Sequence, residues 1–211
     1  MANTSEYTEL ILNAQDDTNL DRIVDAALTC ITRFGMTKTS VEDIAKEAKC
    51  SRATIYRMFP GGKDSILEAV VASELGKFYS AVEERVARID TLEDAISAVI
   101  NEAGLRLINN PALATVITLE PEVILPLLAF ERMNQLLEFA RLIGRHLLER
   151  WIVDEKSERI AEWIARIVIS YSATPAQYFD ITDIDSVKKL VNLFVMPGIS
   201  VMNGNTQPSN G

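Results

Sequence analysis

The chain is poor in cysteine and histidine, the residues that build disulfide frameworks, zinc sites and many catalytic centres. Its 211 residues include two cysteines, Cys30 and Cys50, and a single histidine, His146. Two cysteines give neither a disulfide framework nor a set of metal ligands, and they fit a reducing compartment. The sequence offers no identifiable partner for the histidine, no Gly-rich phosphate loop and no nucleophile elbow. These absences argue against an enzyme and predict no cofactor.

Long hydrophobic runs and a basic leader are also missing. The most apolar windows, EVILPLLAF and RIVISYSA, are too short or too interrupted to cross a bilayer, and the N-terminus lacks the basic start of a signal peptide. We therefore expect a cytoplasmic protein with no membrane partner. The 48% hydrophobic content is nevertheless sufficient for a packed core.

Positive charge is scarce overall but gathered near the N-terminus. The formal net charge of −9 argues at first against a nucleic-acid partner. Between residues 19 and 63, however, eight Lys or Arg stand against five Asp or Glu, a local balance of +3. A basic module on an acidic body is typical of a nucleic-acid reader with a second domain, although charge runs also occur on ordinary solvated surfaces.

Apolar residues follow helical spacing, and no segment alternates convincingly with a period of two, so the predicted fold is all-α. A first helix over about 20–34 ends at Gly35. Thr39 and Glu42 have capping-box spacing for a two-turn helix, and Ser51 can cap a third helix that ends before Pro60. Two short helices joined by a tight turn behind a longer helix match the helix-turn-helix arrangement, whose second short helix enters the DNA major groove.

The remainder of the chain predicts further helices. A single apolar stripe runs from Lys63 to about Ile89, and Thr91 with Asp94 opens the next helix. Pro121 and Pro126 predict short or kinked helices over 112–129. Helical patterns then cover about 129–151, 154–171 and a last stretch after Asp185.

The segment TSVEDIAKEAKCSRATIYRMFPGGKDSIL, residues 39–67, resembles the DNA-binding segment of TetR-family transcriptional regulators. The residues that carry the resemblance, which covers about 19–75, are Gly35, Ile44, Ala45, Ser51, Tyr56, Phe59 and Lys63. It implies an N-terminal three-helix DNA-binding domain and a larger helical domain for ligand binding and dimerisation. We accordingly expect a flexible arm over 1–17, the DNA-binding domain over 18–62, the second domain over 63–202 and a disordered tail over 203–211.

The resemblance also implies which residues touch DNA. Arg52, Ala53 and Thr54 would approach base edges, whereas Ser40, Ser51, Tyr56 and Lys63 would hold phosphates, with Arg57 as a further candidate. The chemistry agrees, because Arg can bond a guanine edge twice, Ala lets the helix come close, and Thr offers a hydroxyl and a methyl. Tyr and Lys suit contacts that fix register on the backbone. Without the flanking pattern, these side chains would be interpreted as ordinary surface residues.

One departure from the family concerns the turn between the two short helices. Where the family often has Gly, this chain has Lys49, for which we expect a positive φ that costs about 1 kcal/mol.

The C-terminal part predicts a partner. Apolar residues over 160–171 exceed what one helix face can bury, which indicates a second buried face, or else a central helix of a monomer. The resemblance implies that helices over about 155–173 and 184–196 form half of a four-helix homodimer interface. The candidate interface residues are Ile160, Trp163, Ile164, Ile167, Val168, Tyr171, Leu190 and Phe194.

The resemblance further implies a pocket for a small-molecule effector. The candidate lining residues are Phe130, Met133, Asn134, Trp151, Trp163 and Tyr171, each of which could instead belong to the core or to a solvated face. We expect an apolar or amphipathic effector, since neither a metal cluster nor a phosphate loop occurs in the sequence.

The hypothesis is a homodimeric repressor that binds a palindromic operator in double-stranded DNA and is released by its effector. Two alternatives stay open. One is an activator or ligand-independent regulator of the same fold, and the other is a helical small-molecule-binding protein without a DNA function.

Overall fold

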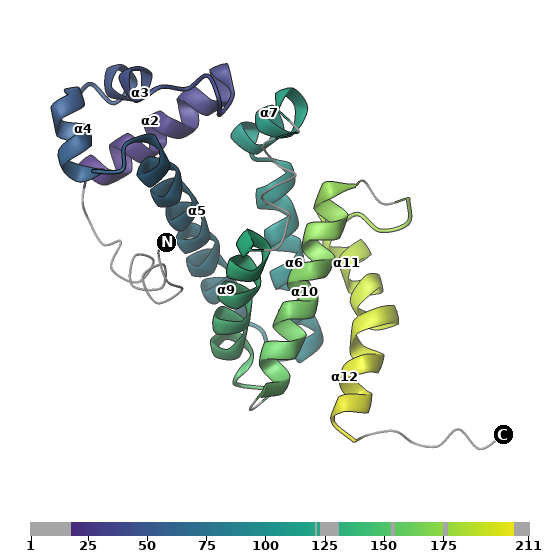
Figure 1. The fold of residues 1–211 in the computed structure, drawn as a ribbon. Coiled ribbons are helices and arrows are strands. Elements are labelled where there is room, and N and C mark those ends of the chain that lie inside the picture. The colour runs from purple at the N-terminus through teal and green to yellow at the C-terminus, as the bar shows by residue number, and fades with distance from the viewer. Residues whose placement is uncertain (1–17, 121, 123–130, 153–154, 175–176, 205–211) are drawn as a thin grey trace. The chain divides into compact units, whose positions relative to one another are not determined.

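A computed structural model of the protein (Figure 1) describes residues 18–120, 122, 131–152, 155–174 and 177–204. Within these ranges every regular element is a helix, which confirms the predicted all-α fold. The expected arm over 1–17, the breaks at Pro121 and Pro126, the pocket candidate Phe130 and most of the expected tail lie outside the described residues. No helix in the described part of the chain is long and apolar enough to span a bilayer.

The chain divides into two compact units, which are described separately. The first comprises Met1–Phe78 with Asn109–Gln135, and the second comprises Tyr79–Ile108 with Leu136–Gly211. The boundary between Phe78 and Tyr79 falls inside one helix, α5 (Lys63–Val86). Each unit is therefore built from two separate stretches of sequence.

The first unit contains the N-terminal part of α5 together with α2 (Thr18–Phe34), α3 (Val41–Glu47), α4 (Arg52–Met58) and α7 (Pro111–Leu119) (Figure 1). Its core gathers buried side chains from α2 to α5, among them Ile23, Ile44, Ile55 and Ile66. Helix α7 packs against α2, and Val116 is buried there with Ile31. A helix from the middle of the sequence thus joins the N-terminal helices.

The start of α3 differs from the predicted cap. The capping box is formed by Ser40 and Asp43, one residue later than the predicted pair Thr39 and Glu42. Thr39 is buried, and its hydroxyl donates to the carbonyl of Gly35 at 2.6 Å. Both pairs have the same spacing, so the pattern alone cannot separate them. The predicted stop at Gly35 is confirmed, with a φ of 83°.

The second unit contains the C-terminal part of α5, α6 (Leu92–Ile108), most of α9 (Glu131–Leu148), α10 (Glu155–Ala173), α11 (Ile184–Leu190) and α12 (Met196–Met202). Buried side chains of α6, α10 and α11, including Ile100, Ile164 and Val187, form its core. Gly144 of α9 faces Ala161 of α10 so closely that an added Cβ would collide with the alanine methyl. The small residues allow these two helices to approach each other.

The last helical stretch is longer than predicted. Instead of ending near residue 196, the chain continues through a π-helical segment, Val191–Val195, into α12. The N–H of Met196 bonds to the carbonyl of Val191, five residues earlier. Pro197 follows, and its ring would clash with the carbonyl four residues back in a regular α-helix, so the wider turn relieves that clash.

Lys49 generates a first prediction, because its φ of 51° confirms the expected left-handed conformation. Replacing Lys49 with Gly should raise the free energy of unfolding by about 1 kcal/mol, since Gly adopts this φ without a Cβ penalty. Lys46→Gly, at an exposed position within α3, should lower it by about 1 kcal/mol. Equilibrium urea unfolding compares the two variants, and a loss of stability in both would contradict the strain at Lys49.

Candidate functional site

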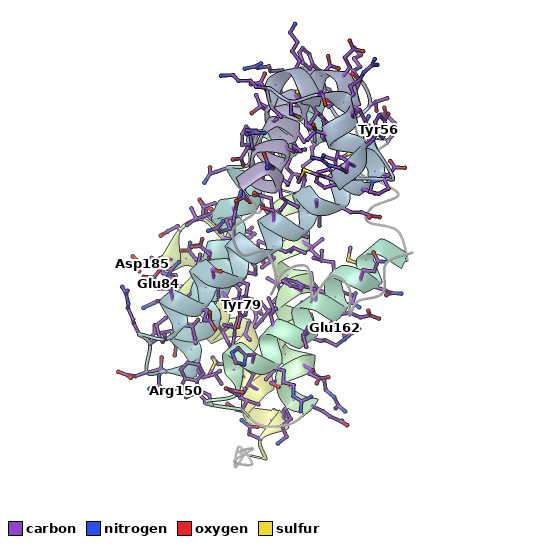
Figure 2. The ribbon with its side chains drawn as sticks, turned by 90° about the vertical axis from the view of Figure 1, so that its left-hand side faces the viewer. Tyr56, Tyr79, Glu84, Arg150, Glu162 and Asp185 are labelled. Atoms are coloured by element: carbon purple, nitrogen blue, oxygen red, sulfur yellow. The ribbon has the colours of Figure 1, made fainter. Side chains whose placement is uncertain are left out.

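Helix α4 buries one side and exposes the other. Ile55 and Phe59 are only 0% and 5% exposed and fix the helix in the core of the first unit. Thr54 is half-buried, while the exposed residues are Arg52, Ala53, Tyr56 and Arg57. Tyr56, labelled in Figure 2, is 52% exposed although it is aromatic. Of the residues of α4 that are predicted to contact DNA, Arg52, Ala53, Tyr56 and Arg57 are therefore exposed, whereas Thr54 is half-buried.

The two predicted serines sit at the starts of short helices. The Ser51 hydroxyl accepts from the backbone N–H of Thr54 at 3.1 Å and lies 2.9 Å from the Thr54 hydroxyl. Ser40 caps α3 and donates its hydroxyl proton to the carboxylate of Asp43. These hydrogen bonds from Ser40 lower the pKa of Asp43. Both serines remain exposed, so capping leaves them accessible.

Arg52 has a partner that DNA would have to displace. Its guanidinium lies 3.6 Å from the carboxylate of Glu42, and both side chains are more than half exposed. Exposed pairs of this kind contribute little to stability. The pair therefore does not prevent Arg52 from reaching a base edge.

Lys63 lies inside the protein's own hydrogen-bond network. Its ammonium donates to the carbonyls of Met36 at 2.6 Å and Thr37 at 3.1 Å, in the turn between α2 and α3. The predicted phosphate contact of Lys63 stays a prediction, and the structure adds this internal role.

The same turn is held by a residue that the sequence did not indicate. Glu120, directly after α7 and 7% exposed, accepts from the N–H of Met36 at 2.6 Å and from the N–H of Thr37 at 3.0 and 3.1 Å. Burial acts to raise the pKa of Glu120, but the hydrogen bonds from Thr37 and Met36 and the charge of Lys63 outweigh it and leave the pKa lowered. No local pattern points from residue 120 to residues more than eighty positions earlier.

In the second unit, an open apolar hollow of about 340 Å³ lies between α10 and the helices that follow it. Five of the eight predicted interface residues line it, namely Trp163, Ile167, Tyr171, Leu190 and Phe194. The other three interface candidates, Ile160, Ile164 and Val168, are buried in the unit's own core. The apolar excess on α10 therefore divides between the core and this hollow.

Only two of the pocket candidates line the hollow. Trp163 and Tyr171 line the hollow, whereas Trp151 donates its indole N–H to the carbonyl of Asp90 at 2.9 Å and carries the Arg150 guanidinium 5.3 Å from its ring centroid. Met133 is half-buried and Asn134 exposed on the first turn of α9, which is grouped with the first unit. An effector site lined by all of these residues stays a prediction.

His146 has neighbours that the sequence did not reveal. Its ring lies 3.7 Å from the carboxylate of Glu83 and 3.9 Å from that of Glu149, and its centroid is 6.3 Å from that of Tyr79. Tyr79, marked in Figure 2, donates to Glu83 at 3.0 Å. Burial and the Glu83 carboxylate raise the pKa of Tyr79 to about 12. The His146 side chain is 58% exposed, and it lies in a surface polar group.

Comparison with known proteins agrees with the helix-turn-helix geometry. Residues 23–70 match the family model described as bacterial regulatory proteins, tetR family. An uncharacterized HTH-type transcriptional regulator of Mycobacterium tuberculosis is 28% identical over 180 residues, which cover 84% of this chain and 83% of the relative.

Solved structures share the fold. The TetR-family repressor AlkX of Dietzia sp., implicated in biodegradation of n-alkanes, has a TM-score of 0.65 and 24% identity, covering 83% of this chain and 97% of its own. FadR of Bacillus subtilis, solved in complex with stearoyl-CoA, has a TM-score of 0.58 and 24% identity, covering 81% and 96%.

The exposed face of α4 and these matches define a helix-turn-helix DNA-binding protein. Residues 23–70 match the DNA-binding segment of the tetR family of bacterial regulatory proteins, which confirms the resemblance that residues 39–67 had indicated. The roles of individual residues in DNA binding stay predictions.

Substitutions at Ser51 separate its capping role from its predicted phosphate contact. Ser51→Ala should lower the free energy of unfolding by about 1 kcal/mol, because α4 loses its N-cap. Ser51→Asp keeps a capping acceptor and so should retain stability, but its charge should weaken DNA binding by about tenfold or more. Urea unfolding and DNA titration at fixed salt measure the two effects.

The matched control is Thr91→Asp, which makes the same charge change at the residue that accepts from the N–H of Asp94 near the start of α6. That variant should bind DNA like the wild type. Equal DNA affinity of Ser51→Asp and wild type would show that Ser51 lies away from the phosphates.

Proposed function

We propose that the protein is a homodimeric repressor that binds a palindromic operator and is released from it by a small apolar or amphipathic effector. The observation that carries the DNA-binding part is the outward face of α4. Arg52, Ala53 and Tyr56 are exposed there because Ile55 and Phe59 are buried on the opposite side. A short capped helix with this face fits the second helix of a helix-turn-helix.

In the proposed complex, Arg52, Ala53 and Thr54 meet base edges, and Tyr56, Ser51 and Ser40 meet phosphates. The N-terminal residues of a recognition helix lie deepest in the major groove, and Arg52–Thr54 form the first turn of α4. Arg57 lies in the last turn of α4, where it supplies a charge near the backbone.

Apolar side chains left uncovered in the second unit support the homodimer. Trp163, Phe194 and Val201 are 44%, 58% and 60% exposed, and the first two border the hollow lined by α10 residues. Exposed apolar surface of this kind indicates an interaction surface. A second copy of the same face would cover it, and two-fold symmetry suits a reader of palindromic half-sites. We therefore assign the hollow to the dimer interface rather than to the effector.

The chemistry of the effector is supported by two relatives. The AlkX repressor is implicated in n-alkane biodegradation, and FadR of Bacillus subtilis was solved with stearoyl-CoA. Both names point to long-chain apolar or amphipathic molecules. By linkage, such an effector releases DNA when it binds the DNA-incompetent state more tightly than the DNA-bound state. A cytoplasmic location and the absence of a catalytic role belong to the same proposal.

The DNA-binding proposal is tested by selection from random duplexes at a stated salt concentration. The wild type should enrich a palindrome, and the Arg52→Ala, Tyr56→Ala double variant should lose at least about tenfold in affinity, because one bidentate base contact alone contributes about 1–3 kcal/mol. Arg88→Ala, which removes an equally positive and largely exposed charge, should bind like the wild type.

Equal, weak binding of wild type and double variant, with no enriched sequence, would favour a small-molecule-binding protein without a DNA function. An enriched operator also allows effectors to be screened by release. Long-chain acyl compounds that leave DNA affinity unchanged would favour a ligand-independent regulator.

The dimer proposal predicts that Phe194→Glu produces monomers. Each of the two copies would bring a new carboxylate into the apolar interface, and removing these charges from water costs several kcal/mol. Sedimentation equilibrium measures the association. Val71→Glu, which introduces the same negative charge at a side chain 51% exposed on α5, should leave the dimer intact. A monomeric wild type, or a Phe194→Glu variant as dimeric as Val71→Glu, would contradict the assignment.

A further inference from the structure

We propose that Glu120 is a positioning residue for DNA binding, which fixes the turn that leads into the helix-turn-helix by binding the backbone amides of Met36 and Thr37. The proposal rests on DNA binding and does not depend on the identity of the effector. It extends the DNA-binding unit to a residue far outside the sequence segment that matches the family model, residues 23–70.

The carboxyl group of Glu120 lies so close to the turn that a side chain at Gly35 would collide with it. Residue Glu120 is 7% exposed, and its carboxylate accepts hydrogen bonds from the two successive N–H groups of the turn. A Cβ at Gly35 would lie 2.9 Å from this carboxyl group, so only Gly admits it so closely. Gly35 also needs its φ of 83°, which favours Gly for a second, independent reason.

Two oppositely charged side chains, Glu120 and Lys63, bind the two sides of one peptide group in the turn. In the peptide between Met36 and Thr37, the N–H points to Glu120 and the C=O accepts from Lys63. A trans peptide has its N–H and C=O antiparallel, so its dipole lies between the carboxylate and the ammonium. Each charge stabilises the orientation that the other requires.

A buried carboxylate is costly unless its hydrogen bonds are satisfied, and the turn supplies them. Conversely, the backbone N–H groups of Met36 and Thr37 need a hydrogen-bond acceptor, and the carboxylate of Glu120 is that acceptor. The two partners therefore hold one conformation of the turn rather than merely adding surface charge.

The turn controls the position of the DNA-contacting elements. Three residues after Thr37, Ser40 caps α3 and is a predicted phosphate contact. Thr39 fastens the intervening chain to the carbonyl of Gly35. Helix α3 in turn packs against α4. Loss of the Glu120 contacts would thus loosen the start of α3 and, through it, the placement of α4 in the groove, since small displacements of a binding constellation weaken it.

The test compares Glu120→Gln with Glu122→Gln in the full-length protein. Both variants remove one negative charge, and Glu122 is exposed. Charge removal alone should strengthen DNA binding slightly. We expect Glu122→Gln to bind the selected operator at least as tightly as wild type and Glu120→Gln to bind about tenfold more weakly, because its amide offers one acceptor instead of a carboxylate.

Hydrogen exchange in the free protein gives a readout that does not involve DNA. The amides of Met36 and Thr37 should exchange about tenfold faster or more in Glu120→Gln, whereas the amide of Ile55, bonded to the carbonyl of Ser51 within the α4 start, should be unchanged. General loss of stability would accelerate all three amides together.

A pH profile adds a second signature. The lowered pKa of Glu120 means that its stabilisation is present above the unfolded Glu pKa and is lost as the pH falls through the folded value. The stability difference between wild type and Glu120→Gln should therefore shrink on acidification below about pH 4.3.

Equal operator affinity of Glu120→Gln and Glu122→Gln would overturn the inference. Should Glu120→Gln be unfolded, Glu120→Asp carries the same comparison against Glu122→Asp, since its carboxylate is one methylene too short to reach both amides. A wild type that selects no sequence counts against the proposed function. A wild type that selects an operator while Glu120 variants bind it normally counts against the positioning role alone.

Discussion

Burial of Ile55 and Phe59 is the constraint on which the DNA-facing surface depends. A helix of seven residues, such as α4, is too short to be stable alone in water, so tertiary packing must hold it. Because these two apolar residues lie one turn apart, their burial also fixes the rotation of the helix. Arg52 and Tyr56, likewise one turn apart, are left outside. The positions of the two apolar residues thus both stabilise α4 and determine which of its side chains are exposed.

Local chemistry explains why much of this unit could be predicted from the sequence. Helical spacing, the Ser51 cap, the stop at Gly35 and the positive φ of Lys49 all depend on residues within about one turn of each other. The prediction was wrong where two local solutions overlap, as for the Thr39 and Ser40 pairs, which only the burial of Thr39 separates. It was also incomplete at Lys63, whose ammonium bonds to a turn twenty-seven residues earlier.

Long-range pairing accounts for what the sequence did not reveal. Glu120 follows an apolar helix and precedes a proline, and nothing near it indicates the amides of Met36 and Thr37. Similarly, the apolar excess on α10 predicted a second buried face, but only the structure shows that Ile160 and Ile164 serve the core while Trp163 and Ile167 border an open hollow. The sequence shows how many apolar residues a helix carries. Which of them are buried in the core depends on the neighbouring helices, which the sequence pattern does not reveal.

Because the first unit is built from two separate stretches of sequence, it cannot be exchanged as one continuous N-terminal segment. A chimeric protein could be made by transferring the N-terminal segment as far as Phe78 to another protein. Such a transfer would leave α7 and Glu120 behind, although both belong to the first unit. The transplanted turn would then carry two backbone amides without their acceptor and a Gly35 whose neighbour is absent. During synthesis on the ribosome, the turn cannot form its final hydrogen bonds until residue 120 has emerged.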